Sequence, residues 1–90
     1  MFSSLIRGIE YTVKRANRSK IITGCDADCT KSDDKHPTIQ LLRGMQGRRL
    51  LECTIHEAYH ACQWDLAEEA VRESAAAIAD VLWKDGWRRV

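Results

Sequence analysis

The chain lacks any long apolar run. No window of its 90 residues approaches the roughly 20 apolar residues of a membrane-spanning helix. Residues 1–7 contain no apolar stretch long enough for a signal peptide. Internal repeats and low-complexity tracts are also missing. These absences argue against a membrane-spanning or secreted protein, and we expect a cytoplasmic one.

The sequence also has almost no net charge. Its 14 basic and 13 acidic residues leave +1 at neutral pH, so the field of the whole protein offers no strong attraction for nucleic acid or for an anionic membrane. Residues 1–24 are locally basic, with Glu10 as their only acidic residue before residue 26. We interpret this bias as a solvated face, and we expect neither a membrane nor a nucleic acid as partner.

The length and composition predict a single small domain over residues 1–90. The 44% hydrophobic and 30% charged content is ordinary for a globular protein. A chain this short buries too little apolar surface to be very stable without a metal or a partner. Because no secretory signal is present, the four cysteines are expected to be reduced thiols.

The first half of the chain predicts a small, mostly antiparallel sheet. Residues 9–13 alternate apolar and polar side chains, and residues 21–23 are a β-branched run, which indicates two short strands. A helix is the alternative for the first of them. Residues 24–37 contain the only proline together with Gly, Asp and Ser, which is typical of an exposed loop. Residues 38–42 predict a further strand.

The second half predicts two consecutive helices. The first covers about residues 48–62, and its apolar residues recur at i, i+4, i+7 and i+11, namely Leu51, Ile55, Ala58 and Cys62. The second covers residues 65–86, with Asp65 as N-cap and Gly86 as C-terminal cap. Its predicted buried stripe consists of Val71, Ala75, Ile78 and Leu82.

The motif His56-Glu57-Ala58-Tyr59-His60 matches H-E-x-x-H. On a helix, positions i and i+4 lie one turn apart on the same face, so both imidazoles can reach one tetrahedral metal. The glutamate then lies beside the water that the metal activates and can take its proton as the water attacks a carbonyl carbon. We therefore predict one Zn²⁺ per chain, bound by His56 and His60, with Glu57 as catalytic base.

A helical wheel separates the motif from the predicted core. At about 100° per residue, Cys53, His56, Glu57 and His60 fall opposite the stripe that contains Leu51. The motif is thus expected to face a cleft, with Cys53 as a small residue lining it. A pair of solvent-facing histidines is the alternative. The predicted fold class is α+β: a small N-terminal antiparallel sheet followed by a zinc-binding helix and a second, glutamate-bearing helix.

Residues 50–87, LLECTIHEAYHACQWDLAEEAVRESAAAIADVLWKDGW, resemble the active-site helix and the glutamate helix of the zincin metallopeptidases. The similarity is to the small gluzincin-like HExxH proteins found in bacteriophages and bacteria, and it rests on the HExxH positions and the downstream EExV. It implies a phage-type or bacterial zinc metallopeptidase, cytoplasmic in the producing or host cell, that acts on a peptide or protein substrate.

This resemblance also implies a third ligand from the second helix. The HExxHxxGxxH pattern is not met, because Gln63 and Leu66 stand at its last two positions. In gluzincins a glutamate on the next helix completes the site, and Glu68 and Glu69 occupy the matching place. We favour Glu68, which at about 100° per residue lies at the edge of the predicted buried face. Glu69 is the alternative, since Glu69 and Glu73 resemble the gluzincin spacing.

A second metal at Cys25 and Cys29, with His36 or the nearby aspartates, is a further hypothesis, although the C-x3-C spacing favours a polar hairpin loop. The expected function is hydrolysis of a peptide bond, with residues 38–42 aligning the substrate if they form an edge strand. The alternative is a non-catalytic zinc-stabilised adaptor that does not need Glu57. A nucleic-acid-binding module is disfavoured by the near-zero charge. The pattern gives no indication of oligomeric state or cleavage specificity.

Overall fold

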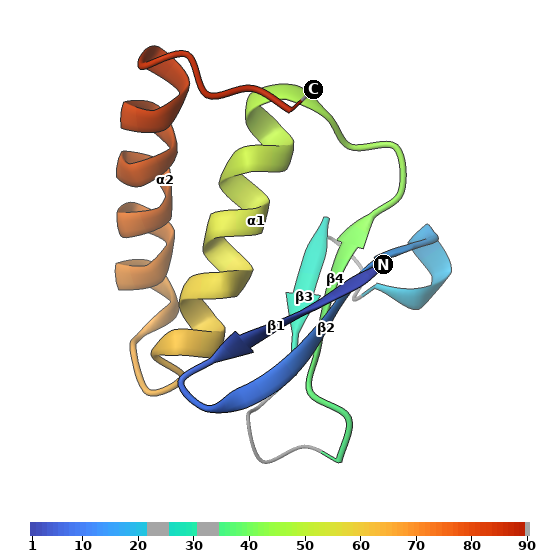
Figure 1. The fold of residues 1–90 in the computed structure, drawn as a ribbon. Coiled ribbons are helices and arrows are strands. Elements are labelled where there is room, and N and C mark those ends of the chain that lie inside the picture. The colour runs from blue at the N-terminus through green and yellow to red at the C-terminus, as the bar shows by residue number, and fades with distance from the viewer. Residues whose placement is uncertain (22–25, 31–34, 90) are drawn as a thin grey trace.

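The computed structural model describes residues 1–21, 26–30 and 35–89. It consists of a four-stranded mixed sheet followed by two helices (Figure 1), so the predicted α+β class is confirmed. The sheet order is β1-β2-β4-β3. The elements are β1 (Phe2–Ile6), β2 (Ile9–Ala16), a 3-10 turn η1 (Arg18–Lys20), β3 (Ala27–Cys29), β4 (Thr38–Leu42), α1 (Gly47–Cys62) and α2 (Glu68–Lys84).

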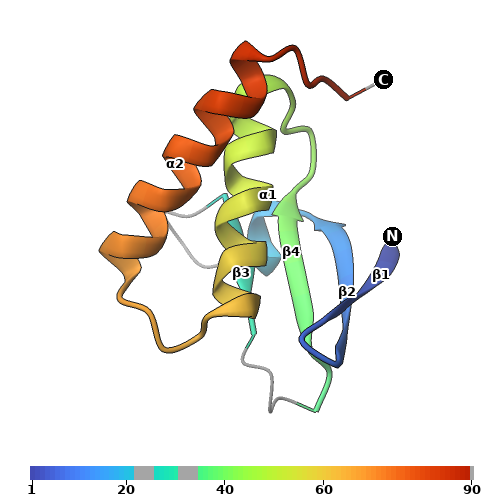
Figure 2. The ribbon, with the colours of Figure 1, turned by 60° about the vertical axis from the view of Figure 1, so that its left-hand side comes forward.

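These elements form three successive layers. α1 lies between the sheet and α2, as the two views in Figures 1 and 2 agree. On one side α1 packs mainly against β3 and β4, and on the other it packs along α2. Neither helix of the described residues is long and apolar enough to cross a membrane. α1 is therefore the central element of the fold, and both of its long faces have a neighbour.

The sheet is mixed because its two middle strands are parallel. β1 and β2 form an antiparallel hairpin whose turn residues, Arg7 and Gly8, have positive φ values of 50° and 83°, as a two-residue hairpin turn requires. β2 and β4 are parallel, whereas β3 and β4 are antiparallel. The expectation of a mostly antiparallel sheet holds for two of its three pairings. The hairpin strand β1 was not predicted.

Two expectations about the strands are wrong. Residues 38–42 do form a strand, β4, but it lies inside the sheet, and β1 and β3 are the edges. Within residues 24–37, expected to be a loop, β3 pairs with β4. Ala27 is buried toward the helix, Cys29 packs against the same core, and Asp28 accepts a hydrogen bond from Gln40 on the other face. The expected strand at 21–23 falls largely outside the described residues.

The core lies between the sheet and α1, and the predicted core stripe of α1 is wrong. The buried residues of α1 are Leu50, Glu57 and Ala61. Leu51 and its stripe partners stay half-buried, and three of them line a shallow pocket of about 350 Å³. The reason is that α1 has apolar side chains on two faces. The sheet covers the face that carries Leu50 and Ala61, not the face that carries Leu51. The core cluster consists of Tyr11, Val13, Ala27, Ile39, Leu41, Leu50 and Ala61.

α2 begins later than predicted. Its N-cap is Ala67, and Asp65 lies in the connection between the helices, so the Asp65 cap is wrong. The predicted end is confirmed, since Gly86 follows the helix with a φ of 96°, the left-handed conformation typical of a glycine cap. Val71 and Ala75 are buried as predicted. In the same stripe Ile78 is 41% exposed and Ala79 is buried in its place, because α2 packs mainly along α1.

Candidate metal centre

Three side chains from the two helices meet at one point. His56 Nε2 of α1 lies 2.9 Å from Glu68 Oε1 of α2, and His60 Nε2 lies 2.6 Å from Glu68 Oε2. The two imidazole ring centroids are 4.8 Å apart. The potential ligand atoms of all three residues lie within 4.8 Å of one another. The structure thus brings together two histidines and a carboxylate that could hold a metal ion.

The donor set fits a transition metal such as zinc. Zinc ligands lie about 2.0–2.2 Å from the ion in a tetrahedral arrangement, so neighbouring ligand atoms are roughly 3.3 Å apart. The two contacts of Glu68, at 2.9 Å and 2.6 Å, would therefore open by only several tenths of an ångström. Other divalent transition metals accept imidazole and carboxylate ligands too. The geometry supports a metal site made of two histidines and one carboxylate.

Local chain geometry explains why the three residues meet. The motif histidines are four residues apart on α1 and therefore share one face. α1 ends at Cys62, where the backbone N–H of Gln63 donates to Tyr59 O at 2.8 Å. The short connection over residues 63–67 then reverses the chain, and Glu68 is the first residue of α2. The tight reversal places this carboxylate against the last turns of α1.

Ion pairs hold α1 in place at its other end. Arg49 donates two hydrogen bonds to Asp26 Oδ2, at 3.0 Å and 2.7 Å, and Arg18 donates to Oδ1 at 2.8 Å. These hydrogen bonds, from Arg18 first and then Arg49, lower the pKa of Asp26. Arg48 pairs with Asp80 of α2 at 3.0 Å. The start of α1 is thus tied both to the segment before β3 and to α2.

Glu57 lies on the sheet side of α1, not on an open face. It is 8% exposed and is the only buried charged residue among those described. Burial raises its pKa to about 7, with further contributions from the negative charges of Glu68 and Asp28. The expectation that the whole motif faces away from the core is therefore wrong for this residue. A carboxyl group with such a pKa exchanges a proton near neutral pH.

The cysteines near Glu57 are protonated at neutral pH. Burial, followed by the charges of Glu57, Asp28 and Cys62, raises the pKa of Cys29 to about 12. Burial also raises the pKa of Cys53, which is half-buried against the core. Neither thiol belongs to the group of His56, His60 and Glu68 that could hold a metal ion. Cys25 lies outside the described residues, and the hypothesis of a second metal there stays untested.

Glu68, and not Glu69, is the carboxylate that gathers with the histidines. Its role as a ligand remains part of the proposal. Sequence reasoning missed Arg72, whose Nη2 lies 4.0 Å from Glu68 Oε1. The i,i+4 spacing of these two residues on α2 could have indicated the contact.

Comparisons with known proteins do not assign this chain to a family. No protein-family model matches the chain, and neither curated proteins nor solved structures gave a match. What the structure supports is a possible metal site made of His56, His60 and Glu68.

Proposed function

We propose that this protein is a zinc-dependent peptidase of the gluzincin type. The observation that supports it is the joint position of His56, His60 and Glu68, with Glu57 buried next to His56 in the same motif. Three protein ligands leave a fourth zinc position open, as hydrolytic zinc sites require. Glu68 is the proposed third ligand, because Glu69 is not part of the group.

The proposed chemistry divides the work between the metal and Glu57. When bound, zinc supplies a Lewis acid that polarises a substrate carbonyl and acidifies water. Glu57 accepts a proton from the attacking water and later returns it to the leaving amine. The burial of Glu57, which raises its pKa to about 7, strengthens its electrostatic interactions with reacting groups. His56 and His60 hold the metal and take no part in proton transfer.

An extended peptide is the proposed substrate. β3 is an edge of the sheet and packs against α1, and Cys29 on β3 lies close enough to Glu57 for the charge of Glu57 to raise the pKa of the Cys29 thiol. An edge strand presents unpaired backbone groups to which an extended peptide can bind. β3 therefore replaces residues 38–42 as the proposed aligning strand, since β4 lies inside the sheet.

A non-catalytic zinc-stabilised adaptor is the second candidate. It is favoured by the absence of the histidines from the lining of the two described cavities, of about 870 Å³ and 350 Å³. A site without a deep pocket has little means to select a small substrate. In the adaptor, zinc would only cross-link α1 to α2, and Glu57 would have no chemical role.

The two candidates are separated by metal analysis combined with a broad peptide-cleavage screen. The peptidase should bind one zinc per chain and cleave peptides, and Glu57→Gln should retain the zinc while losing nearly all cleavage. Glu73→Gln is the matched control, because Glu73 is exposed on α2, and it should cleave normally. Zinc without cleavage would favour the adaptor. Failure to bind zinc would contradict both candidates.

A further inference from the structure

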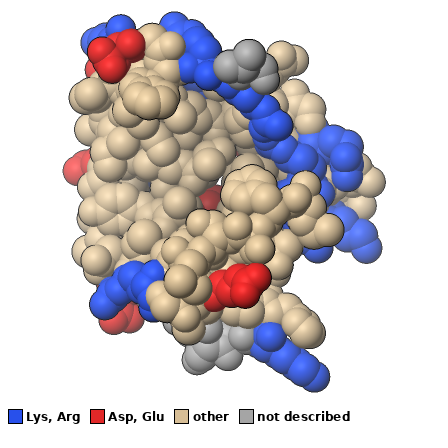
Figure 3. All heavy atoms as spheres, viewed as in Figure 1, with Lys and Arg blue, Asp and Glu red and all other residues tan. Residues whose placement is uncertain are grey.

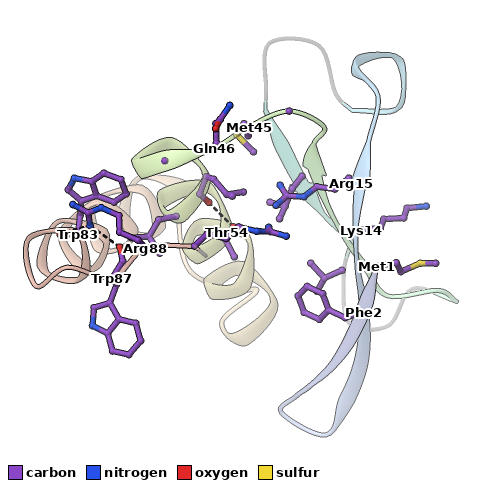
Figure 4. A pocket seen from close by; sticks show the side chains of 17 residues that line it. Met1, Phe2, Lys14, Arg15, Met45, Gln46, Thr54, Trp83, Trp87 and Arg88 are labelled. Atoms are coloured by element: carbon purple, nitrogen blue, oxygen red, sulfur yellow. Dashed lines mark hydrogen bonds between the residues drawn. The ribbon is translucent and has the colours of Figure 1, made fainter.

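A wide groove lies on the opposite side of α1 from the candidate metal centre. Its volume is about 870 Å³, and it is formed by β1, β2, the first turns of α1 and the C-terminal tail. Figure 4 shows Phe2 on β1 and Arg15 on β2 facing the groove from the sheet side, with Trp83, Trp87 and Arg88 across from them. None of His56, His60 and Glu68 lines it, so this surface is separate from the metal chemistry.

The groove exists because α1 covers only part of the sheet. An α-helix is about 10 Å wide and neighbouring strands are about 4.8 Å apart, so one helix covers roughly two strands. α1 packs mainly on β3 and β4. Phe2 shares the helix-bearing face with its partner Val13, yet it is 61% exposed. β1 therefore keeps an exposed strip beside α1, whereas Tyr11 and Val13 of β2 are buried.

The charges in this groove have a single sign. Its described lining contains the side chains of Arg15, Arg88 and Arg89 and not one carboxylate side chain, whereas the Lys14 side chain points away from α1 (Figure 4). Figure 3 shows Lys and Arg side chains along the upper and right-hand rim of this face. Arg88 is already engaged, since its guanidinium stacks on the Trp83 ring at 3.4 Å and donates to Trp83 O. The remaining rim is a positive surface around an apolar floor.

Arg15 is the second observation that points to an acidic ligand in this groove. Its side chain points from β2 toward α1, and its Nη1 atom is shielded from solvent without a hydrogen-bond partner among the described residues. A guanidinium donor that is shielded and unsatisfied costs free energy. Burial, together with the nearby positive charge of Arg89, lowers the pKa of Arg15. A carboxylate placed in the groove would compensate the positive charges of Arg15 and Arg89.

We propose that this groove binds an amphipathic helix of a partner protein that carries an apolar stripe flanked by acidic residues. The apolar stripe would pack on Phe2, Leu51 and Trp87 and cover β1. An acidic residue beside the stripe would pair with the positive charge of the half-buried Arg15 guanidinium. The exposed apolar side chains of Phe2 and Trp87 favour the apolar face of an amphipathic helix, and the single sign of the charges requires an acidic one.

The test uses a synthetic, lactam-bridged helical peptide of about 15 residues, or roughly four turns, with a leucine stripe flanked by glutamates. Its binding to the full chain is measured by fluorescence anisotropy, and the site is mapped by amide chemical shifts. The acidic peptide should shift residues of β1, β2 and the tail. The same peptide with lysines in place of the glutamates should not bind. Binding that maps elsewhere, or no binding at concentrations on the order of millimolar, would overturn the proposal.

Arg15→Met is the decisive variant, with Lys20→Met as control, because Lys20 is exposed and does not line the groove. Arg15→Met should weaken peptide binding about tenfold or more, since hydrogen bonds between charged groups are the strong ones. Its Tm should be unchanged or higher, because an unsatisfied donor is removed. Equal affinity for both variants would contradict the proposed contact.

Two other occupants of the groove would be detected in parallel experiments. Stronger binding to anionic phospholipid vesicles than to the acidic peptide would replace the protein partner with a membrane surface. A concentration-dependent dimer, dissociated by Arg15→Met in sedimentation experiments, would replace it with a second copy of this chain. Either result would overturn the proposed partner.

Discussion

The buried position of Glu57 makes a quantitative prediction for the metal-free protein. Its pKa is raised from 4.5 to about 7 in the folded state, whereas in the unfolded chain it returns to the lower value. Below pH 4.5 the group is neutral in both states and costs nothing. As the pH rises from 4.5 to about 7, the unfolded chain releases this proton while the folded protein retains it, so the folded state of the chelator-treated protein is progressively destabilised. Above about 7 the group is ionised in both states and the loss of stability is complete.

The magnitude follows from the two pKa values. One pH unit between them corresponds to 1.36 kcal/mol, so the difference between 4.5 and about 7 destabilises the folded protein by about 3 kcal/mol at pH values above both. Glu57→Gln does not titrate and avoids this cost. The unfolding free energy of the variant relative to the natural protein should therefore increase by about 3 kcal/mol from about pH 4.5 to about pH 8, a large fraction of the stability of a small domain.

Urea denaturation in the presence of a chelator at several pH values measures this difference. Glu73→Gln corrects for any general effect of removing one negative charge from the chain, because Glu73 is exposed. Adding zinc should cancel the pH dependence, since a bound cation near a carboxylate favours its charged form. Parallel stability curves for Glu57→Gln and the natural chain across the whole range would refute the argument and would mean that Glu57 is solvated.

Four further predictions concern the third metal ligand, the effect of zinc on stability, and the roles of Asp26 and Gly86. Glu68→Gln should weaken zinc binding about tenfold or more, whereas Glu69→Gln should change it little, as measured by competition with a chelator; the opposite order would reassign the ligand. Zinc at about 100 times its Kd should add about 2.7 kcal/mol and raise Tm by roughly 10–20 °C, measured by thermal denaturation. Asp26→Asn should speed hydrogen exchange in β3, because it weakens the contacts to Arg49. Gly86→Ala should cost about 1 kcal/mol in urea denaturation, since φ is 96° and the strain is in the backbone alone.

The elements whose apolar residues recur at a regular spacing were predictable from the sequence, and those without such a pattern were not. The observed limits of α1, β2 and β4 agree with the prediction to within a few residues, although β4 has only five residues. β3 is three residues long and stands among aspartates and serines. Such a strand forms because β4 offers it a partner, so its signal is tertiary and not local. β1 depends on the same kind of pairing with β2.

The periodicity of α1 does not show which of its faces meets the sheet. That orientation determines whether Glu57 is buried. The helix has one apolar set around Leu51 and another around Leu50 and Ala61, and a wheel favours the more hydrophobic of the two. In the structure the sheet covers the second set, because α1 must face β3 and β4 while α2 occupies its other side. The spacing alone therefore identified the histidines, but it could not show that Glu57 is buried.

The environments of the two carboxylates suit the two different roles proposed for them. The Glu68 side chain is 54% exposed and contacts both histidines, at the first residue of α2. A carboxylate in the first turn of a helix is stabilised in its charged form by the helix dipole, and a metal ligand must be charged. Glu57 is 8% exposed and its pKa is about 7, so it can both accept and release a proton near neutral pH. Acid–base chemistry commonly depends on such a separation of environments. In a chain of 90 residues it arises because α1 directs one face to the sheet and another to α2.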